Sequence, residues 1–238
     1  MALLEVEIVQ AGYEQDRVII QDVQFRLESG ELIGLIGPNG AGKSTTIKTI
    51  LGLMRHHNGS VKFKRGTNYS YIPERPVFYD SLTLWEHLDF IAAVEGLEQE
   101  TYIRKANGLL EWYKLKKHAH DFPQTYSKGM QQKAMLILAM ITEPDVYIID
   151  EPFIGLDPNA MKLFLELIEE ERKRGAGILM STHVLDTAEK VCDRFLIINE
   201  GRLCASGKLD EIQSLCGLPN GSLFQCFHSI AEGKHHDE

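Results

Sequence analysis

"GPNGAGKST", residues 37–45, decides the fold of this chain. It fits the pattern G-x-x-x-x-G-K-[ST], and it follows the apolar run "ELIGLIG" and precedes a segment of helical periodicity. In a strand–loop–helix unit of this kind, backbone N–H groups wrap the phosphates of a nucleotide, and glycine allows the close approach. The positive end of the following helix adds roughly half a charge. An accidental glycine-rich turn, the alternative interpretation, leaves the flanking strand and helix unexplained.

Two side chains of this loop have chemical roles beyond wrapping the phosphates. Lys43 adds a full positive charge toward the outer phosphates, and the Ser44 hydroxyl can ligate Mg²⁺. The loop alone predicts nucleoside triphosphate binding and names no reaction. The residues predicted to bind nucleotide in this stretch are Gly37, Asn39, Gly40, Ala41, Gly42, Lys43, Ser44 and Thr45.

A pair of adjacent acids, Asp150 and Glu151, ends the apolar run "VYIIDEP". Neighbouring side chains along a strand point in different directions, so two consecutive acids can do two tasks. Asp150 can hold Mg²⁺, directly or through water, and Glu151 can orient or deprotonate an attacking water. The alternative is a solvated strand end. The phosphate loop in the same chain favours the catalytic interpretation.

Composition limits the class of protein. The net charge of −9 argues against nucleic acid as a primary partner. The longest apolar run, Ala134–Ile141, has eight residues, whereas a membrane-spanning helix needs about 18. The N-terminus "MALLEVEIVQ" alternates like a strand and carries acids, so we expect no signal peptide and a cytoplasmic location. The four cysteines show no CxxC spacing and are expected to be reduced thiols.

Strand and helix patterns alternate along the chain, which predicts an α/β fold with a mixed central sheet and flanking helices. A single domain is expected over residues 1–238. Helical patterns over about 82–140 predict an inserted lobe, with a capping box at Thr83 and Glu86 and a second helix over roughly Glu100–Leu115. Residues 58–72 predict short strands of a small antiparallel β lobe, with turns at Asn58-Gly59 and Arg65-Gly66. About 216–238 is expected as a C-terminal tail, and its end, "AEGKHHDE", as disordered.

These motifs, in this order from residue 4 to about 215, resemble the ATP-binding cassette (ABC) family of P-loop NTPases. The family signature LSGGQ is replaced here by "YSKGM", which keeps Ser127 and Gly129 and changes Tyr126, Lys128 and Met130. Ser127 is a plausible helix N-cap, and Gly129 permits close approach to a γ-phosphate. A plain N-capped core helix is the alternative. The resemblance implies that this segment closes over the ATP of a second cassette, head to tail, so a homodimer is expected.

Three more positions match the family by resemblance. Tyr13 lies where the family has an aromatic side chain that stacks on adenine; a core or surface tyrosine is the alternative. Asp157 in "GLDP" is similar to a residue that contacts the opposite cassette, and it also fits an ordinary N-cap. His183, in "ILMSTH", is similar to the histidine that touches the γ-phosphate, although a lone histidine is often structural.

Glu74, in "SYIPERP", departs from the family, which has glutamine at a position that reaches Mg²⁺ and links ATP to the transport partner. A unit charge pair at about 4 Å is worth about 4 kcal/mol at an effective dielectric of about 20, so a carboxylate here should matter. We expect altered Mg²⁺ dependence. The stretch between Gly59 and Tyr71 is also short for the family, which predicts a reduced β lobe.

The combination of "STTIKTILGLM", "IPERP" and "IIDEPFIGLDP" is most similar to the bacterial EcsA-type exporter ATPases. That resemblance implies an ATPase that drives transport through a separate transmembrane permease, peripheral on the inner face of the membrane. The aromatic residues Phe78, Tyr79 and Trp85 are candidates for the docking surface, with simple core packing as the alternative. A soluble single-cassette ATPase, for example in iron–sulfur assembly, and a regulatory module with an inactive site remain the competing classes.

Overall fold

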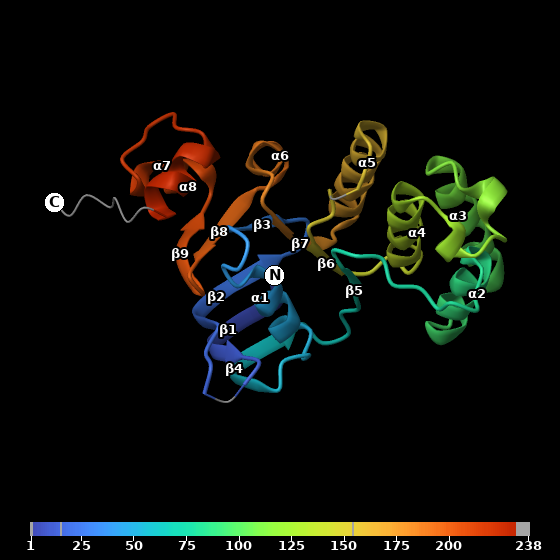
Figure 1. The fold of residues 1–238 in the computed structure, drawn as a ribbon, viewed down its shortest axis with the longest axis horizontal. Coiled ribbons are helices and arrows are strands. Elements are labelled where there is room, and N and C mark those ends of the chain that lie inside the picture. The colour runs from blue at the N-terminus through green and yellow to red at the C-terminus, as the bar shows by residue number, and fades with distance from the viewer. Residues whose placement is uncertain (1, 15, 154, 232–238) are drawn as a thin grey trace.

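One mixed sheet organises the computed structural model, which describes residues 2–14, 16–153 and 155–231 (Figure 1). Within those residues nine strands pair in the order β4-β1-β2-β9-β8-β3-β7-β6-β5. The strands are β1 (Ala2–Gly12), β2 (Ile20–Glu28), β3 (Leu32–Ile36), β4 (His56–Phe63), β5 (Tyr69–Ile72), β6 (Val146–Asp150), β7 (Gly177–Thr182), β8 (Arg194–Asn199) and β9 (Arg202–Gly207). The helices are α1 (Lys43–Ile50), α2 (Leu84–Val94), α3 (Gln99–Trp112), α4 (Lys128–Met140), α5 (Pro158–Arg174), α6 (Leu185–Val191), α7 (Leu209–Leu215) and α8 (Leu223–Ala231), with 3₁₀ turns at Lys116–His118 and Pro123–Thr125.

The middle of the sheet is parallel, and the predicted mixed α/β architecture is confirmed. β3 pairs in parallel with both β7 and β8, and β6 lies between β7 and β5. Strands in this region are buried on both faces, which explains why their sequences are continuous apolar runs. Their carboxyl ends therefore meet at one edge of the sheet, where the phosphate loop and the acid pair follow β3 and β6.

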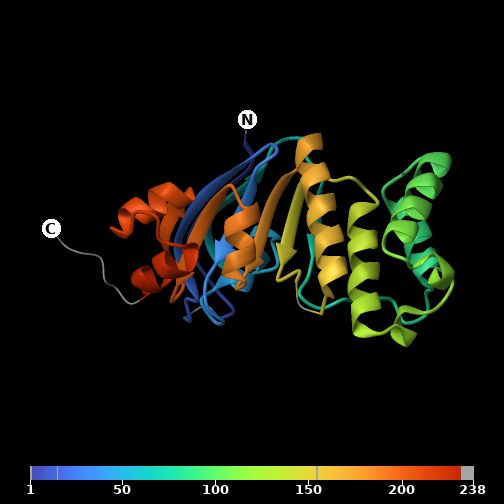
Figure 2. The same cartoon turned by 90° about the horizontal axis from the view of Figure 1, so that it is seen from above.

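Helices cover both faces of this sheet. Successive residues of β7 divide between two cores: Ile178 and Met180 belong to the core that includes α5, and Leu179 belongs to the core that includes α1. Figure 2 shows α5 and α6 lying side by side on one face of the curled sheet. The helix after the phosphate loop is thus fixed against the opposite face from α5.

The antiparallel part of the sheet, β4-β1-β2, corrects one turn prediction. β4 runs unbroken from His56 to Phe63, so the turn expected at Asn58-Gly59 was wrong. Gly59 has φ 123°, and a Cβ there would meet Glu7 O at 2.0 Å, next to a register shift in β1. A glycine can therefore indicate either a turn or a place inside a strand where another backbone approaches closely. The turn predicted at Arg65-Gly66 is present.

The helical insertion lies between β5 and β6, with α2 and α3 at the end of the molecule opposite to α7 and α8 (Figure 1). The capping box at Thr83 and Glu86 is confirmed, because each side chain accepts a hydrogen bond from the other residue's backbone N–H. α3 ends at Trp112, earlier than predicted, and Lys114, two residues later, has φ 59°. The lobe shares one apolar core with α5.

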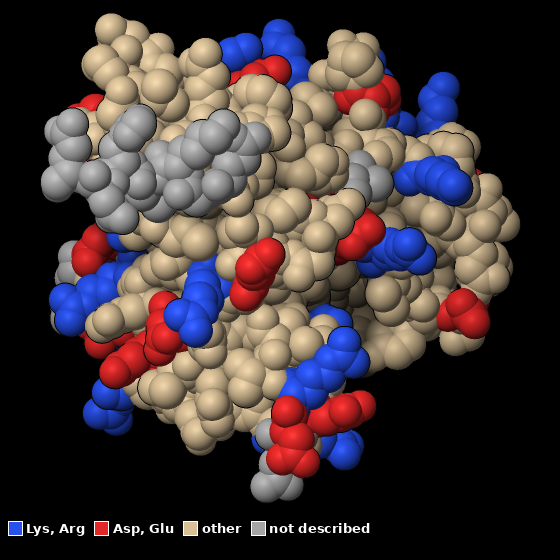
Figure 3. All heavy atoms as spheres, turned by 60° about the vertical axis from the view of Figure 1, so that its left-hand side comes forward, with Lys and Arg blue, Asp and Glu red and all other residues tan. Residues whose placement is uncertain are grey.

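The C-terminal region is folded further than the sequence suggested. Within the expected tail, α8 forms and buries Leu223, Cys226 and Ile230 against α6 and α7. The segment expected to be disordered falls mostly on residues 232–238, outside the described residues. The four cysteines are free thiols, as predicted. On the face shown in Figure 3, acidic and basic side chains lie interspersed. In the described ranges, none of the helices has both the length and the apolar character that crossing a membrane requires.

Candidate functional site

Two glycines of the phosphate loop, Gly42 and Gly37, are required for different reasons. Gly42, the residue before α1, has φ 110°, and a Cβ there would lie 2.5 Å from the Ile20 side chain. Gly37 has no unusual φ; instead a Cβ there would meet Ile198 O of β8 at 2.4 Å. Gly37 therefore provides room for the loop to lie against β8 and is not needed for an unusual dihedral.

Lys43 closes the loop upon itself. Its ammonium donates hydrogen bonds to Gly37 O at 2.8 Å and to Pro38 O at 3.3 Å. It also lies 3.4 Å from Glu151 Oε1, with both side chains at least nine-tenths buried. Glu151 Oε1 has no hydrogen-bond partner among the described residues. A buried carboxylate oxygen without a donor is costly, so this atom faces a position suited to a ligand or a water.

The acid pair diverges because the backbone turns at Glu151. β6 ends at Asp150, and Glu151 has φ 50°, so the strand alternation we expected does not set its direction. Such a conformation is unfavourable for a non-glycine residue by about 1–2 kcal/mol and is found preferentially at functional sites. The turn sends the Glu151 carboxylate toward His183, whose Nδ1 lies 2.8 Å from Oε2 and whose backbone N–H also donates to it.

Ser181, on β7, holds the two acids in place. Its hydroxyl donates to Asp150 Oδ1, and it accepts a hydrogen bond of 3.1 Å from the Glu151 backbone N–H. Asp150 and Ser181 are both buried. Sequence reasoning missed Ser181; the signal was a polar pair, Ser181-Thr182, inside an otherwise apolar strand.

A hollow of about 370 Å³ gathers most of the predicted nucleotide and metal ligands. Glu74 borders it and so shares the space of the phosphate loop and Glu151. Four of the predicted residues do not line the hollow but adjoin residues that line it: Gly37, Ala41, Asp150 and His183. The predicted residues that line the hollow are Tyr13, Asn39, Gly40, Gly42, Lys43, Ser44, Thr45, Glu74 and Glu151. Its size lies within the range of small-molecule sites.

The oxygen donors at this hollow suit Mg²⁺. Burial raises the pKa of Tyr71 to about 12, with contributions from the charges of Asp150 and Glu74, which places both carboxylates near this ring. Mg²⁺ in nucleotide sites is held by one or two carboxylates together with substrate phosphates. No cluster of three or more His, Cys, Asp or Glu side chains forms a complete metal site in the described part of the chain. Ser44 and Glu74, which line the hollow, and Asp150, which is buried behind it, are therefore suited to a metal that arrives with a nucleotide.

Ser127, Gly129 and Asp157 form a second group, apart from this hollow. Ser127 caps α4 by accepting a hydrogen bond from Met130 N–H, as predicted. Asp157 caps α5 by accepting from Ala160 N–H, and Lys133 donates to its other oxygen at 3.2 Å. A Cβ on Gly129 would lie 3.5 Å from Gly155 O. The start of α4 is thus joined to the loop before α5.

The three altered signature letters have separate structural roles. Tyr126 is buried, and its hydroxyl donates to His118 O and Asp121 O, while burial raises its pKa to about 12. Met130 packs on the core of the helical lobe, and Lys128 is exposed. The substitutions at Tyr126 and Met130 serve packing, and the residues kept at Ser127 and Gly129 form the accessible start of α4.

The two groups lie at separate places in a single chain. α1 follows β3, whereas α4 packs on β5, which is three strands away in the sheet order β3-β7-β6-β5. Three strand spacings amount to about 14 Å of rigid sheet. Figure 1 shows α4 beyond β5 and β6 on the side remote from α1. Each chain therefore presents the two groups at separate places in the fold.

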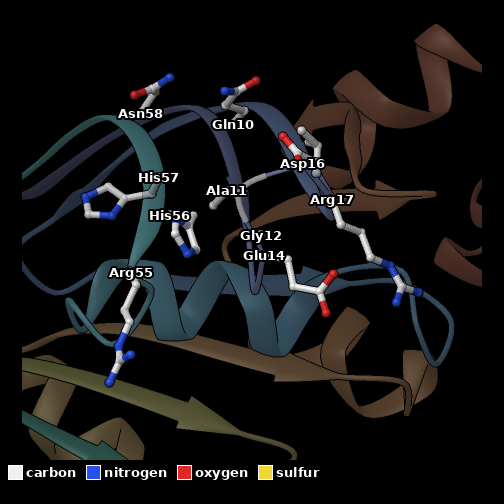
Figure 4. Close-up of a pocket in the computed structure, with 11 residues that line it drawn as sticks. Gln10, Ala11, Gly12, Glu14, Asp16, Arg17, Arg55, His56, His57 and Asn58 are labelled. Atoms are coloured by element: carbon white, nitrogen blue, oxygen red, sulfur yellow. The ribbon is translucent and has the colours of Figure 1, made fainter.

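Two further hollows lie near this site. An apolar groove of about 440 Å³ between the segment after β5, α2 and α4 is lined by Phe78, Tyr79 and Phe90. Trp85, expected with them, instead packs against His120 and the lobe core. A polar hollow lies beside the loop after β1, and Gly12, Glu14, Arg17, Arg55, His56 and His57 are among its lining residues (Figure 4).

Comparison with known proteins supports the nucleotide interpretation. The family described as "ABC transporter" matches residues 20–154. An uncharacterized ABC transporter ATP-binding protein of Bacillus subtilis, YthP, is 50% identical over 97% of this chain and 98% of its own length. The ABC-type transporter ATP-binding protein EcsA of the same organism is 44% identical, covering 94% of each chain. A solved ATP-binding subunit of an ABC transporter superposes with a TM-score of 0.91 at 44% identity, covering 96% of this chain and 99% of that one.

Proposed function

Because this chain belongs to the ABC transporter family as an ATP-binding and ATP-hydrolysing subunit of the kind paired with permeases, we propose that it drives an exporter by head-to-tail closure of two cassettes. Two copies would bury ATP between the phosphate loop of one and the Ser127 segment of the other. The observation that carries the proposal is the separation of these half-sites within one chain. Export as the direction rests on similarity to EcsA-type ATPases.

The residues of the hollow supply the chemistry of hydrolysis. Lys43 exchanges its hydrogen bonds to Gly37 O and Pro38 O for bonds to the outer phosphates. Glu151, with one oxygen held by His183, accepts the proton of the attacking water. Ser44, Asp150 and Glu74 would hold Mg²⁺, which neutralises phosphate charge when bound. After cleavage, repulsion between like charges reopens the pair of cassettes.

A permease would dock in the apolar groove beside the helical lobe. Val77, Tyr79 and Phe90 are exposed there to 79%, 61% and 48%, an unusual concentration of large apolar side chains on a surface. The groove borders β5, and the segment that carries Glu74 directly follows β5, so a partner in the groove contacts the chain next to the nucleotide site. Docking there places the ATPase at the inner face of the membrane.

The dimer is tested by a cysteine crosslink between exposed positions next to each half-site. Asn39→Cys and Lys128→Cys are placed in separate, differently tagged copies that carry Glu151→Gln to prevent hydrolysis and Cys204→Ser to remove the exposed thiol. We expect a mixed crosslinked dimer with ATP and Mg²⁺, and none without nucleotide or with Lys43→Ala in the Asn39→Cys copy. If ATP binds and no crosslink between chains forms, the head-to-tail mechanism is wrong.

The permease is tested by copurification of the tagged chain from detergent-solubilised membranes, with a multi-span membrane protein as the expected partner. Phe90→Asp should abolish the copurification, whereas Val94→Asp, on the same helix but outside the groove, should not. A soluble scaffold protein as the stable partner would instead indicate a soluble cassette ATPase. Absence of ATPase activity in the purified wild-type chain would indicate a regulatory module.

A further inference from the structure

Helix α1 holds Tyr13 as well as the phosphate loop. The Lys48 ammonium donates a hydrogen bond of 3.3 Å to the Tyr13 hydroxyl and lies 5.3 Å from the centre of the ring. Lys48 therefore lies over one side of the Tyr13 ring, near its hydroxyl, and the face that is open to a ligand is the opposite one. The Thr45 side chain interacts with the same hydroxyl.

Spacing along α1 explains this arrangement. Lys48 follows Ser44 by four residues and Thr45 by three, so all three side chains lie on neighbouring positions of one helix face. The helix that presents the phosphate ligands therefore also fixes the orientation of Tyr13. The pKa of the Tyr13 hydroxyl is lowered, first by Thr45 and then, against desolvation, by Lys48, in keeping with these contacts.

The other side of Tyr13 provides little support. The loop backbone on both sides of it, at Gly12 and Glu14, borders the polar hollow of about 430 Å³ shown in Figure 4. Tyr13 itself is 55% exposed. Among the described residues, the polar contacts of its side chain all come from α1. Loss of Lys48 would thus free the ring to move.

We propose that Lys48 is a positioning residue for the nucleotide base: it holds Tyr13 so that the open face of its ring is presented to the base. This inference rests on the proposed ATP site. It predicts that Lys48 contributes to the binding of a nucleotide with a base and contributes nothing to a bare polyphosphate. A lysine that merely attracted phosphates would strengthen the binding of both.

The test compares ATP with inorganic tripolyphosphate, each titrated with Mg²⁺ by calorimetry. Lys48→Met should weaken ATP binding about fivefold, which equals about 1 kcal/mol, and leave tripolyphosphate binding unchanged. KM for ATP should rise by a similar factor while kcat stays within about twofold. Lys48→Arg should restore ATP affinity. Arg17→Met, which removes a charge on the other side of the same loop, serves as the matched control. It should change the affinity for neither ATP nor tripolyphosphate.

A double-mutant cycle with Tyr13→Phe isolates the contact, because phenylalanine keeps the ring and removes the hydroxyl. The losses from Lys48→Met and Tyr13→Phe should be non-additive. Additive losses, or equal weakening of tripolyphosphate, would overturn the inference. If Lys48→Met lowers the melting temperature, its effect on ATP binding could come from lost stability. ATP binding by Tyr13→Phe then tests the same contact. If the wild-type chain binds no ATP, the proposed function is wrong. If it binds ATP and Lys48→Met leaves the ATP affinity unchanged, only this inference is wrong.

Discussion

The Lys43 ammonium lies 3.4 Å from Glu151 Oε1, and the two side chains are among the most buried charged groups of the described residues. Each charge offsets part of the cost of burying the other, because a buried charge without a partner costs several kcal/mol. The pair links the phosphate loop, which follows β3, to the residue after β6, with β7 between them. Lys43, the cation for the phosphates, and Glu151, the proposed general base, therefore stabilise each other electrostatically.

Glu151→Gln should stop hydrolysis and keep ATP binding. Glutamine has the same shape and can still contact His183, but it cannot accept the proton of an attacking water, so we expect at least a 100-fold fall in kcat. With ATP and Mg²⁺, the variant should accumulate as a dimer in size-exclusion chromatography. Glu170→Gln, an exposed change on α5, is the control. A fully active Glu151→Gln variant would refute the assignment.

Glu74→Gln should change the metal dependence of the ATPase. Glu74 lines the nucleotide hollow and its charge reaches Tyr71 together with that of Asp150, so removing it alters the field at the proposed Mg²⁺ position. We expect the Mg²⁺ concentration for half-maximal activity to shift, and Mn²⁺ to replace Mg²⁺ with a different efficiency. Glu95→Gln, the same change at the exposed end of α2, should leave both unchanged. Identical metal titrations for Glu74→Gln and wild type would exclude Glu74 from the metal site.

Tyr126→Phe should lower stability and spare activity. The variant loses the buried hydroxyl that donates to His118 O and Asp121 O, which leaves these carbonyl oxygens with one donor fewer. We expect the free energy of unfolding to fall by about 1 kcal/mol, measured by urea denaturation. The ATPase rate should remain within about twofold, because Tyr126 points into the lobe core. A large loss of activity at unchanged stability would show that this altered signature letter acts on the nucleotide.

The ion pair between Lys105 and Glu143, at 2.8 Å, should make part of the stability depend on pH. The neighbouring Lys105 ammonium lowers the pKa of Glu143, so the folded state binds the proton less readily than the unfolded state. This contribution is present above the unfolded pKa and is lost as pH falls through the folded pKa. Glu143→Gln should therefore reduce the free energy of unfolding by up to about 1 kcal/mol at pH 7. The difference from wild type should shrink at pH 4 and below, and a constant difference across this range would contradict the assignment.

Periodicity and motif spacing predicted most of the architecture. Alternation identified Leu4, Val6 and Ile8 as one buried face, and the apolar runs identified the central parallel strands. Features that depend on contacts between distant segments were not predictable. Gly59 looked like a turn because nothing in its neighbourhood reveals that Glu7 O lies against it. Helix α8 was missed because its burial depends on α6 and α7.

The candidate site also divides into residues that local sequence predicted and residues that depend on contacts between distant segments. The phosphate loop and the acid pair were found because their chemistry is compact in sequence. Ser181, Lys48 and Lys133 act on partners 31, 35 and 24 positions away, so only the fold reveals them. Lys48 could have been noticed as a cation one helical turn beyond Ser44, but its partner could not.

The close fit of Gly37 against Ile198 O has a consequence for synthesis on the ribosome. β3 is made early, yet both of its neighbours in the sheet, β7 and β8, are translated more than 130 residues later. A nascent chain that stops before residue 194 carries the complete glycine-rich sequence but lacks the surface that shapes it. Such a chain should not retain ATP, and the capacity to do so should arise late, when β8 leaves the exit tunnel.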